Sequence, residues 1–543
     1  MSAVPCTTLI FDIGDVLFSW SPVTSTSIKP KQLKAILNSP TWHSYECGAL
    51  DEQDCYARVG AQFSLDPAEV RQAFADARAS LQPDDTFLSF IRKLQVETGN
   101  SLRIFAMSNI SAPDYEVLRT KSADWSIFER VFTSAAAGQR KPNLGFYRYV
   151  LSETGVDPAR TVFVDDKPEN VLSARACGLN AIVFDKPADV CRALRNYVLD
   201  PVARAHSFLK SRAGYHDSFT DTGVTIGDNF CQLLLLEATH DRSLVRYMQY
   251  PDKWNFFREK PTLTTESFPC DLDTTSIGLM VTQPAPEVFA RVMDEMLTYR
   301  TDEGIVLTYF DPERPRVDPV VCCNVLSLFY SQGRGADVAV TLNFVAAVLK
   351  HRAYEDGTRY YEGAEPFLFF LSRLLKFNDD TALHARLDTL FAARIAERVG
   401  SPGDALALAM RILACAQAGI RNEIDLRTLR MMQEEDGGWP SGWFYKYGSS
   451  GVRIGNRGLT TALAINALNV FSAGRFIDVV PTTRTVGSRP ISTTASSLVP
   501  RGHRKRRSVR EIAKEMRAYV FARPVVLHAR KGSDTSSDED SSF

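Results

Sequence analysis

The chain has 543 residues, more than one ordinary hydrophobic core accommodates, so we expect two or three domains. Its 45% hydrophobic and 23% charged residues are typical of a soluble globular protein, and its net charge of −1 gives no long-range attraction to nucleic acid or to acidic membranes. No apolar run approaches the roughly 20 residues of a membrane-spanning helix, the N-terminus lacks the basic start of a signal peptide, and the ten cysteines show no short-spaced pair motif. We therefore expect a cytoplasmic protein with reduced thiols, without a nucleic-acid partner and without stable membrane insertion.

The first 200 residues alternate short apolar runs with helical stretches. The runs TTLIFDIG, LRIFAMSN, TVFVDD and NAIVFD have the length and composition of buried parallel strands. Strands separated by helices predict an α/β domain over residues 1–200, built on a doubly wound parallel sheet. A helical block between the first two strands, at about residues 21–95, is long enough to form an inserted cap.

Residues 201–478 show a different pattern, with little strand signal and many amphipathic stretches. Helices are predicted at Glu287–Tyr299, Pro319–Ser331, Ala336–Lys350, Glu365–Lys376, Thr381–Val399, Pro402–Gln417 and Gly458–Phe471. Successive helices joined by short loops predict an all-α domain, either an α-α barrel or a helical array.

Residues 479–543 begin with a stretch rich in Ser, Thr, Pro and Gly, and they predict a disordered tail. The basic run RGHRKRRSVR is either a solvated segment or a nuclear-targeting or RNA-binding patch. No aromatic residues interleave this run, and the acidic segment SDTSSDEDSS follows it, which favours the solvated segment.

Polar residues follow the predicted strands of the first domain at the points where the strands end. In an open α/β sheet, ligands bind at this edge. Asp12 ends the first strand, and the further residues of this kind are Ser108, Asn109, Lys141, Asp165 and Asp166. Each is common at a strand end by itself, but their occurrence in order, at strand ends or in the loops that follow, predicts a functional site.

This arrangement resembles the haloacid dehalogenase superfamily, over about 200 residues. The resemblance implies that Asp12 is a nucleophile that attacks phosphorus and forms an aspartyl-phosphate. It also implies a Mg²⁺ ion held by Asp12, the backbone carbonyl of Gly14, Asp165 and Asp166. The phosphoryl oxygens would be bound by Ser108 and Lys141, with Asn109 beside them.

Gly14 departs from the pattern of the family's phosphatases, which usually carry a second Asp two residues after the nucleophile. Asp15 is the next residue, but neighbouring side chains point to opposite sides of an extended strand. The domain would then be a slow phosphatase, one restricted to a good leaving group, or a scaffold. A phosphate leaving group needs less acid help than an alkoxide, which favours cleavage of a diphosphate to a monophosphate.

The stretch PCDLDTTSIG carries Asp271 and Asp273, two residues apart and followed by Thr274 and Thr275. Two close carboxylates cannot both ionise readily, so one keeps its proton with a raised pKa. Such an acid in apolar surroundings is suited to protonating a weak base such as an alkene. The alternative is a helix N-cap, because Asp and Thr often precede an apolar helix.

The segment QEEDGGWPSGWFYKYG, residues 433–448, is similar to the QW motif of triterpene cyclases, where it ties barrel helices together. The acid motif, the helical region and this segment together resemble class II terpene cyclases. Behind a dehalogenase-like domain, the DxDTT form of the acid motif resembles the drimane-type sesquiterpene synthases, over about residues 5–475. The resemblance therefore implies an α-α barrel of the class II terpene cyclase type.

The resemblance implies a two-part reaction on farnesyl diphosphate. Asp273 would protonate the terminal alkene with support from Asp271 and Thr274, and two ring closures would give a bicyclic drimenyl or albicanyl diphosphate. The first domain would then remove one or both phosphates, and downstream tailoring enzymes are conceivable partners.

A cyclase of this kind needs cations for the diphosphate and aromatic faces for the carbocation. Lys446 and Arg453 flank a Gly-rich loop and are predicted to bind phosphate. Asp318 and Asn324 open a predicted helix and are candidates for the same site, although helix capping explains Asp318 equally well. The aromatic candidates are Trp254, Phe256, Phe257, Tyr309, Phe310, Tyr360, Tyr361, Trp443, Phe444 and Tyr445.

Two other functions remain open on the sequence. One is a phosphatase for prenyl or other phosphates, in which the helical domain only binds substrate. The other is a non-enzymatic scaffold with a degenerate phosphatase domain. The position of Asp273 separates them from a cyclase, which requires this residue to face a closed apolar cavity.

Overall fold

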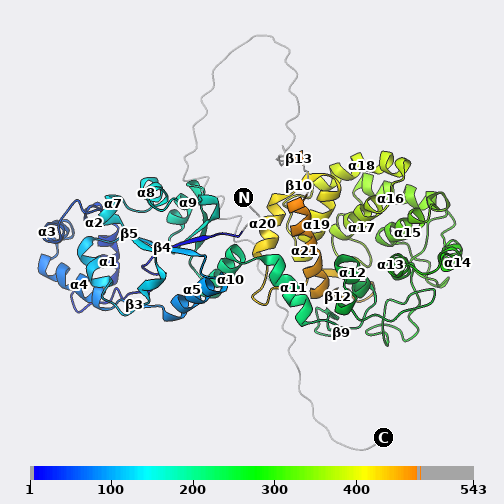
Figure 1. Cartoon of the computed structure of the whole chain (residues 1–543), viewed down its shortest axis with the longest axis horizontal. Coiled ribbons are helices and arrows are strands. Elements are labelled where there is room, and N and C mark those ends of the chain that lie inside the picture. The colour runs from blue at the N-terminus through cyan, green and yellow to red at the C-terminus, as the bar shows by residue number, and fades with distance from the viewer. Residues whose placement is uncertain (1–4, 474–476, 479–543) are drawn as a thin grey trace, which may run out of the picture. The chain divides into compact units, whose positions relative to one another are not determined.

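The computed structural model describes residues 5–473 and 477–478. Its first part is built on a five-stranded parallel sheet with the strand order β5-β4-β1-β6-β7 (Figure 1). The strands are β1 (Thr8–Phe11), β4 (Arg103–Ser108), β5 (Arg130–Thr133), β6 (Thr161–Asp165) and β7 (Asn180–Val183). The four predicted strands are confirmed, whereas β5 was not predicted because its four residues begin with an arginine.

Helices cover both faces of this sheet, as a doubly wound fold requires. On one face, the core side chains of β1 pack with α5 (Asp85–Glu97) and α10 (Pro187–Val198). On the other face they pack with α8 (Leu144–Thr154) and α9 (Pro168–Ala176). Two short helices, α6 (Ala112–Leu118) and α7 (Ser134–Ala137), follow β4 and β5.

A separate helical cluster is inserted after β1. It consists of α1 (Pro30–Leu37), α2 (Pro40–Glu46), α3 (Glu52–Phe63) and α4 (Pro67–Ala79). These helices share a core of their own around Trp42 and Phe74. The two-stranded ribbon of β2 (Phe18–Ser19) and β3 (Gln82–Pro83) leads into and out of the cluster. The cluster is therefore a cap, and it ends with α4, because α5 belongs to the core of the sheet.

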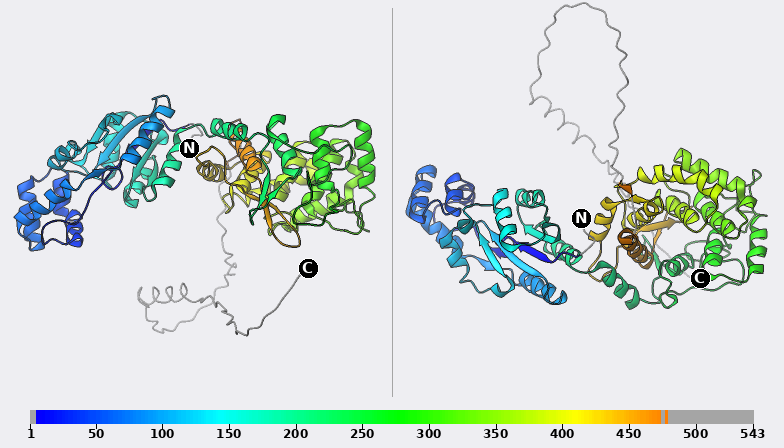
Figure 2. Two further views of the ribbon diagram at one scale, coloured as in Figure 1. Left: turned by 90° about the horizontal axis from the view of Figure 1, so that it is seen from below. Right: turned by 45° about the horizontal axis from the view of Figure 1, so that its top comes forward.

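The second part is a closed ring of helices, in which each member contacts the next and the last contacts the first. In order they are α12 (Phe230–Thr239), α13 (Leu272–Thr282), α15 (Pro319–Ser331), α17 (Glu365–Lys376), α19 (Ala405–Gln417) and α21 (Arg457–Ala473). The further helices of this part are α11 (Pro201–Ser211), α14 (Pro286–Met296), α16 (Ala339–His351), α18 (Thr381–Ala396) and α20 (Glu423–Met431). The predicted α-α barrel is confirmed, and Figure 2 shows it from two further directions.

This part also contains strands, although its residues show little strand pattern. The strands β8 (Ser218–Thr220), β9 (Thr225–Ile226), β11 (Trp443–Lys446) and β12 (Arg453–Gly455) form an antiparallel sheet in the order β11-β12-β8-β9. Strands of two to four residues are too short to show an alternating pattern. A further parallel pair joins β10 (Ile420–Arg421) to β13 (Ile477–Asp478).

The QW-like segment connects three helices of the second part. The side-chain amide of Gln433 donates to the carbonyl of Pro201 at the start of α11, over 2.8 Å. The indole of Trp439 donates to the carbonyl of Leu429 on α20 over 2.6 Å, and its backbone amide donates to Thr461 on α21. The role expected of this segment therefore agrees with its contacts.

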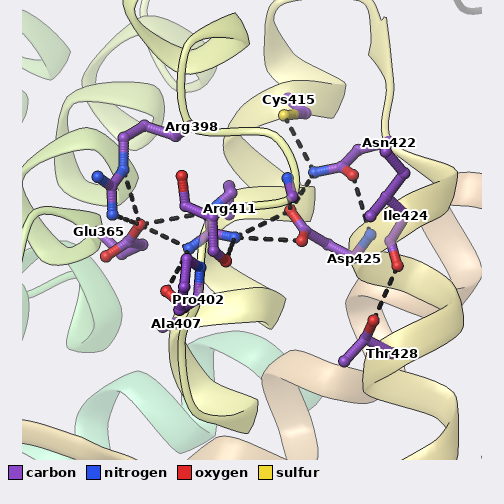
Figure 3. Close-up of polar contacts among 12 residues, drawn as sticks. Glu365, Arg398, Pro402, Ala407, Arg411, Cys415, Asn422, Ile424, Asp425 and Thr428 are labelled. Carbon is purple, nitrogen blue, oxygen red and sulfur yellow. Dashed lines mark hydrogen bonds and ion pairs between the residues drawn. The ribbon is translucent and has the colours of Figure 1, made fainter. Parts of the chain in front are cut away.

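A buried ion-pair network holds α17, α19 and α20 together (Figure 3). Arg411 on α19 is completely buried and lies 2.8 Å from Glu365 on α17 and 3.1 Å from Asp425 on α20. Arg398 binds the same oxygen of Glu365 over 2.6 Å. The network explains how a charged residue lies inside the largely apolar helix α19.

The predicted boundary between residues 200 and 201 falls between α10 and α11, and the domain limits stay a prediction. The predicted disordered tail lies outside the described residues. Within the described ranges, no helix combines the length and apolarity that crossing a membrane requires.

Candidate active sites

The first site lies where β1, β4 and β6 end. Asp12, Ser108 and Asp165 are buried there, together with Lys141 from the loop before α8. The ammonium group of Lys141 lies 2.8 Å from Oδ1 of Asp12 and 2.6 Å from Oδ2 of Asp165. A buried cation thus holds the predicted nucleophile and a second carboxylate in fixed positions, and the carboxylates raise the pKa of the lysine against the opposing effect of burial.

Asn109 holds the lysine segment in place. Its Nδ2 donates to the carbonyl of Lys141 over 2.9 Å, and its Oδ1 accepts from the amide of Lys141 over 2.8 Å. Asn109 and Ser108 line the same cavity as Asp12, and the amide of Asn109 has a second N–H, so its phosphate contact stays a prediction.

The carboxylates of Asp12, Asp165 and Asp166 offer ligand atoms within 4.8 Å of one another. Asp165 already accepts hydrogen bonds from Lys141, Asn170 and the backbone amide of Lys167. Asp12, Gly14 and Asp166 line the cavity. An all-oxygen donor set of this kind fits a hard divalent cation, so the residues present are suited to a metal ion.

A cavity of about 660 Å³ opens between this edge of the sheet and the cap. Trp20, Leu37, Trp42, Phe74 and Leu81 contribute an apolar wall. Asp15 also lines the cavity, so the expectation that its side chain points away is wrong. The chain is not extended there, because Asp15 adopts a left-handed backbone conformation with φ of 58°.

The second site contains the aspartate pair, and both interpretations of that motif hold in part. Asp271 caps α13, and its Oδ1 accepts from the amide of Thr274 over 2.6 Å. Asp273 lies in the first turn of the same helix, buried and facing a cavity. The cap therefore fixes the direction in which the second carboxyl group points.

Two neutral donors hold the carboxyl group of Asp273. Nδ2 of Asn324 on α15 donates to Oδ1 over 2.6 Å, and the hydroxyl of Tyr361 donates to Oδ2. Burial raises the pKa of Asp273 to about 7, and these donors limit the rise. Burial and the charge of Asp273 raise the pKa of Asp271 to about 8.

Asp271 keeps unused hydrogen-bonding capacity in the cavity. Its Oδ2 and the hydroxyl of Thr274 are buried without a partner among the described residues. Thr275 is engaged elsewhere, since its hydroxyl accepts from the amide of Trp254 over 2.9 Å. Asp318 caps α15 through the amide of Val320, as the capping interpretation expected.

The cavity beside the aspartate pair has a volume of about 460 Å³ and is largely aromatic. Its rings belong to Phe230, Phe256, Phe257, Phe268, Tyr309, Tyr360, Tyr361, Tyr445 and Tyr447. Among the predicted aromatic candidates, Trp254, Phe310, Trp443 and Phe444 do not line it. Trp254 packs on α13 at Gly278, where a Cβ atom would lie 2.6 Å from the indole.

Cations line the same cavity, but they are only partly those expected. Lys446 lines it and pairs with Glu362 over 3.0 Å. Arg453 lies outside the lining, where it pairs with Asp221 over 3.0 Å and stacks on Trp443. Of the two cations predicted to bind phosphate, only Lys446 therefore lines the cavity.

Three arginines that the sequence did not single out line the cavity instead, namely Arg314, Arg316 and Arg359. Within the described ranges, no carboxylate forms an ion pair with Arg316 or Arg359, whereas Arg314 pairs with Asp311. Arg316 donates to the hydroxyl of Tyr360 over 3.0 Å. They lie in irregular loops, where no local sequence pattern marks them as site residues.

Comparison with known proteins gives the same two parts. Residues 202–332 match the family model of the sesquiterpene cyclase astC-like C-terminal domain. Drimenol cyclase drtB of Aspergillus calidoustus is 46% identical over 460 residues, which cover 85% of this chain and 87% of drtB. Sesquiterpene phosphatase astK of Aspergillus oryzae is 39% identical over 196 residues, 36% of this chain and 98% of astK.

A solved structure, that of a variant of the type II terpene cyclase MstE from Scytonema, covers 50% of this chain and 97% of MstE at 14% identity, with a TM-score of 0.38. The parallel sheet with its cap and the closed helical ring define a haloacid dehalogenase-like domain joined to a class II-type terpene cyclase domain. The chain belongs to the family of drimane-type sesquiterpene synthases that includes drtB.

Proposed function

We propose that the protein is a bifunctional sesquiterpene synthase. It cyclises farnesyl diphosphate to a bicyclic drimenyl or albicanyl diphosphate and then removes one or both phosphates in its dehalogenase-like domain. The observation that carries this proposal is the buried carboxyl group of Asp273, held by Asn324 and Tyr361 at the wall of an aromatic cavity. The family membership supports it.

Asp273 supplies the proton that starts cyclisation. The O–H bond of its carboxyl group breaks, its electron pair stays on the oxygen, and the π electrons of the terminal alkene form the new C–H bond. The pKa of about 7 that burial gives Asp273 keeps part of the population protonated at neutral pH. Asn324 and Tyr361 then stabilise the carboxylate that remains.

The aromatic wall stabilises the positive charge as the two rings close, because the faces of aromatic rings attract cations. Loss of a proton from the bicyclic cation ends the cascade. The diphosphate survives, since the reaction begins with protonation and not with loss of diphosphate. Arg314, Arg316, Arg359 and Lys446 bind that group at the same cavity.

In the dehalogenase-like domain, Asp12 attacks the terminal phosphorus. The P–O bond to the leaving group breaks with its electron pair, and water hydrolyses the aspartyl-phosphate. Lys141 and Ser108 bind the phosphoryl oxygens, and the apolar wall of the cap accommodates the terpenyl chain. Asp12, the carbonyl of Gly14, Asp165 and Asp166 would hold a Mg²⁺ ion, which would offset the negative charge between the nucleophile and the phosphoryl group.

The position of Gly14 bears on which phosphate leaves. A monophosphate leaving group requires little protonation, so removal of the first phosphate is the faster step. Release of the alcohol requires a proton donor, which Gly14 does not supply. Asp15 lines the cavity, but its carboxylate accepts from the indole of Trp20 over 3.4 Å. We therefore expect the bicyclic monophosphate to accumulate before any alcohol.

The test is incubation of the purified protein with farnesyl diphosphate and Mg²⁺, followed by mass spectrometry of the intact phosphorylated products. The wild type should form a bicyclic product. Asp273→Asn should form only linear farnesyl products while still removing phosphate, and Asp12→Asn should accumulate bicyclic diphosphate. If the wild type yields only farnesol or farnesyl phosphate, the helical domain is a substrate-binding module and the proposal is wrong.

A further inference from the structure

Asn324 lies between the carboxyl group of Asp273 and a buried arginine. Its Nδ2 donates to Oδ1 of Asp273 over 2.6 Å, and its Oδ1 accepts from Arg373 over 2.9 Å. Asn324 is completely buried and Arg373 is 5% exposed. The three residues come from successive members of the helical ring, α13, α15 and α17, so the arrangement depends on the closed ring.

The arginine determines which way the amide of Asn324 faces. A guanidinium group only donates hydrogen bonds, so the atom of Asn324 that faces it must be the carbonyl oxygen. The amino group of Asn324 then faces Asp273, to which it can only donate a hydrogen bond. With a neutral or accepting residue at position 373, the amide could rotate and present its oxygen to Asp273.

Glu237 on α12 holds the arginine in place. Its two carboxylate oxygens lie 3.2 Å from Nε and 2.5 Å from the second terminal nitrogen of Arg373. A bidentate pair of this kind fixes the plane of the guanidinium group. The remaining terminal nitrogen is the one that reaches Asn324. A chain of oriented groups therefore runs from Glu237 through Arg373 and Asn324 to the acid.

We propose that Glu237 and Arg373 are positioning residues for the cyclase, which fix Asn324 as a donor to Oδ1 of Asp273 and so confine the transferable proton to Oδ2. The partner of Oδ2, the hydroxyl of Tyr361, is not fixed as a donor, because a hydroxyl can rotate and accept. This inference rests on the proposed role of Asp273 as the acid. The positive charge behind Asn324 disfavours a proton on Oδ1. After transfer, the same oriented donor stabilises the carboxylate without any rearrangement, which accelerates the transfer step.

The test is a double-mutant cycle between Arg373→Gln and Asn324→Ala, with steady-state kinetics of cyclisation as the readout. Because Arg373 acts through Asn324, each single change should lower kcat by roughly tenfold to a hundredfold with little change in KM, the range expected for one hydrogen bond to a charged group. The double variant should be no slower than Asn324→Ala. If the losses of kcat in the two single variants multiply in the double variant, the proposal is overturned.

A pH profile separates positioning from a loss of packing. Arg373→Gln removes a positive charge that lowers the pKa of Asp273, so the alkaline limb of kcat should move to higher pH while the maximum falls. The titratable or charged groups near Asp273 are Asp271, Asp318, Cys322, Cys323, Tyr361 and Arg373. If Arg373→Gln is slower but the alkaline limb of its kcat profile stays at the wild-type pH, the proposal is contradicted.

Two further variants keep the test decisive. Glu237→Gln retains a side chain of the same size and should give a smaller loss of kcat in the same direction, and Arg373→Lys should recover part of the loss because it keeps the charge. Far-UV circular dichroism and thermal unfolding report on folding of the helical ring in each variant. If Asp273→Asn still cyclises, the proposed function fails; if it does not, and Arg373→Gln and Glu237→Gln match the wild type, only this inference fails.

Discussion

The hydroxyl of Tyr361 donates a hydrogen bond to Oδ2 of Asp273, 88 residues earlier in the chain. Removing this donor with Tyr361→Phe should raise the pKa of Asp273, because the carboxylate loses a stabilising partner. A weaker acid transfers its proton more slowly, so we expect cyclisation to fall by about tenfold or more. The alkaline limb of the pH–rate profile should move upward, and a downward shift would contradict this role.

The pH dependence of stability should report the raised pKa of Asp271. Burial raises that pKa to about 8, whereas an unfolded aspartate titrates near about 3.9. The folded state therefore binds more protons between these values, and the free energy of unfolding falls as the pH rises through the window.

Asp271→Asn keeps the acceptor that caps α13 but removes this titration. The variant and the wild type should unfold at similar denaturant concentrations at pH 4. Between pH 4 and 8 the variant should gain up to about 1.4 kcal/mol per pH unit relative to the wild type. A difference that stays constant over this range would show that Asp271 does not titrate there.

The two arginines Arg316 and Arg453 provide a matched pair of substitutions. Arg316→Ala should raise KM for farnesyl diphosphate by about tenfold to a hundredfold, because it removes from the cavity wall a cation that pairs with no carboxylate among the described residues. Arg453→Ala removes the same charge outside the lining and should leave KM within about twofold. Equal effects of the two changes would place the diphosphate elsewhere.

The buried network around Arg411 should carry stability and not catalysis. Arg411→Met leaves the buried Asp425 without its arginine and leaves Glu365 with Arg398 alone, and we expect a loss of about 3–5 kcal/mol in the free energy of unfolding. Arg398 is 24% exposed, and Arg398→Met should cost at most about 1 kcal/mol. Denaturant unfolding of the two variants measures both, and a similar loss in each would contradict the ranking.

The predicted residues that line the two cavities are those that stand next to a recognisable pattern. Asp12 and Ser108 end apolar strands, and Asp271 and Asp273 form a compact motif, so local spacing was sufficient to place them there. Lys446 was found because it lies within the QW-like segment. In each case the information lies within a few residues of the side chain.

The residues that were missed depend on closure of the helical ring. Arg316 and Arg359 lie in loops without a pattern, and Arg373 sits in an amphipathic helix like any other basic residue. The packing of α13 with α15 and of α15 with α17 brings Arg316 and Arg359 to the cavity, and it brings Arg373 close to Asp273 through Asn324. The direction of the Asp15 side chain was predicted wrongly for a local reason. The prediction assumed an extended strand, and the sequence pattern does not reveal the left-handed turn after β1.

The contact of α21 with α12 has a consequence for synthesis of the chain. The last helix of the ring closes it against the first, so the walls around Asp273 are complete only after residues 457–473 have left the ribosome. A nascent or truncated chain carries the aspartates but lacks the enclosure that raises their pKa. The aspartate pair is therefore not enclosed until residues 457–473 have been synthesised and have packed against α12.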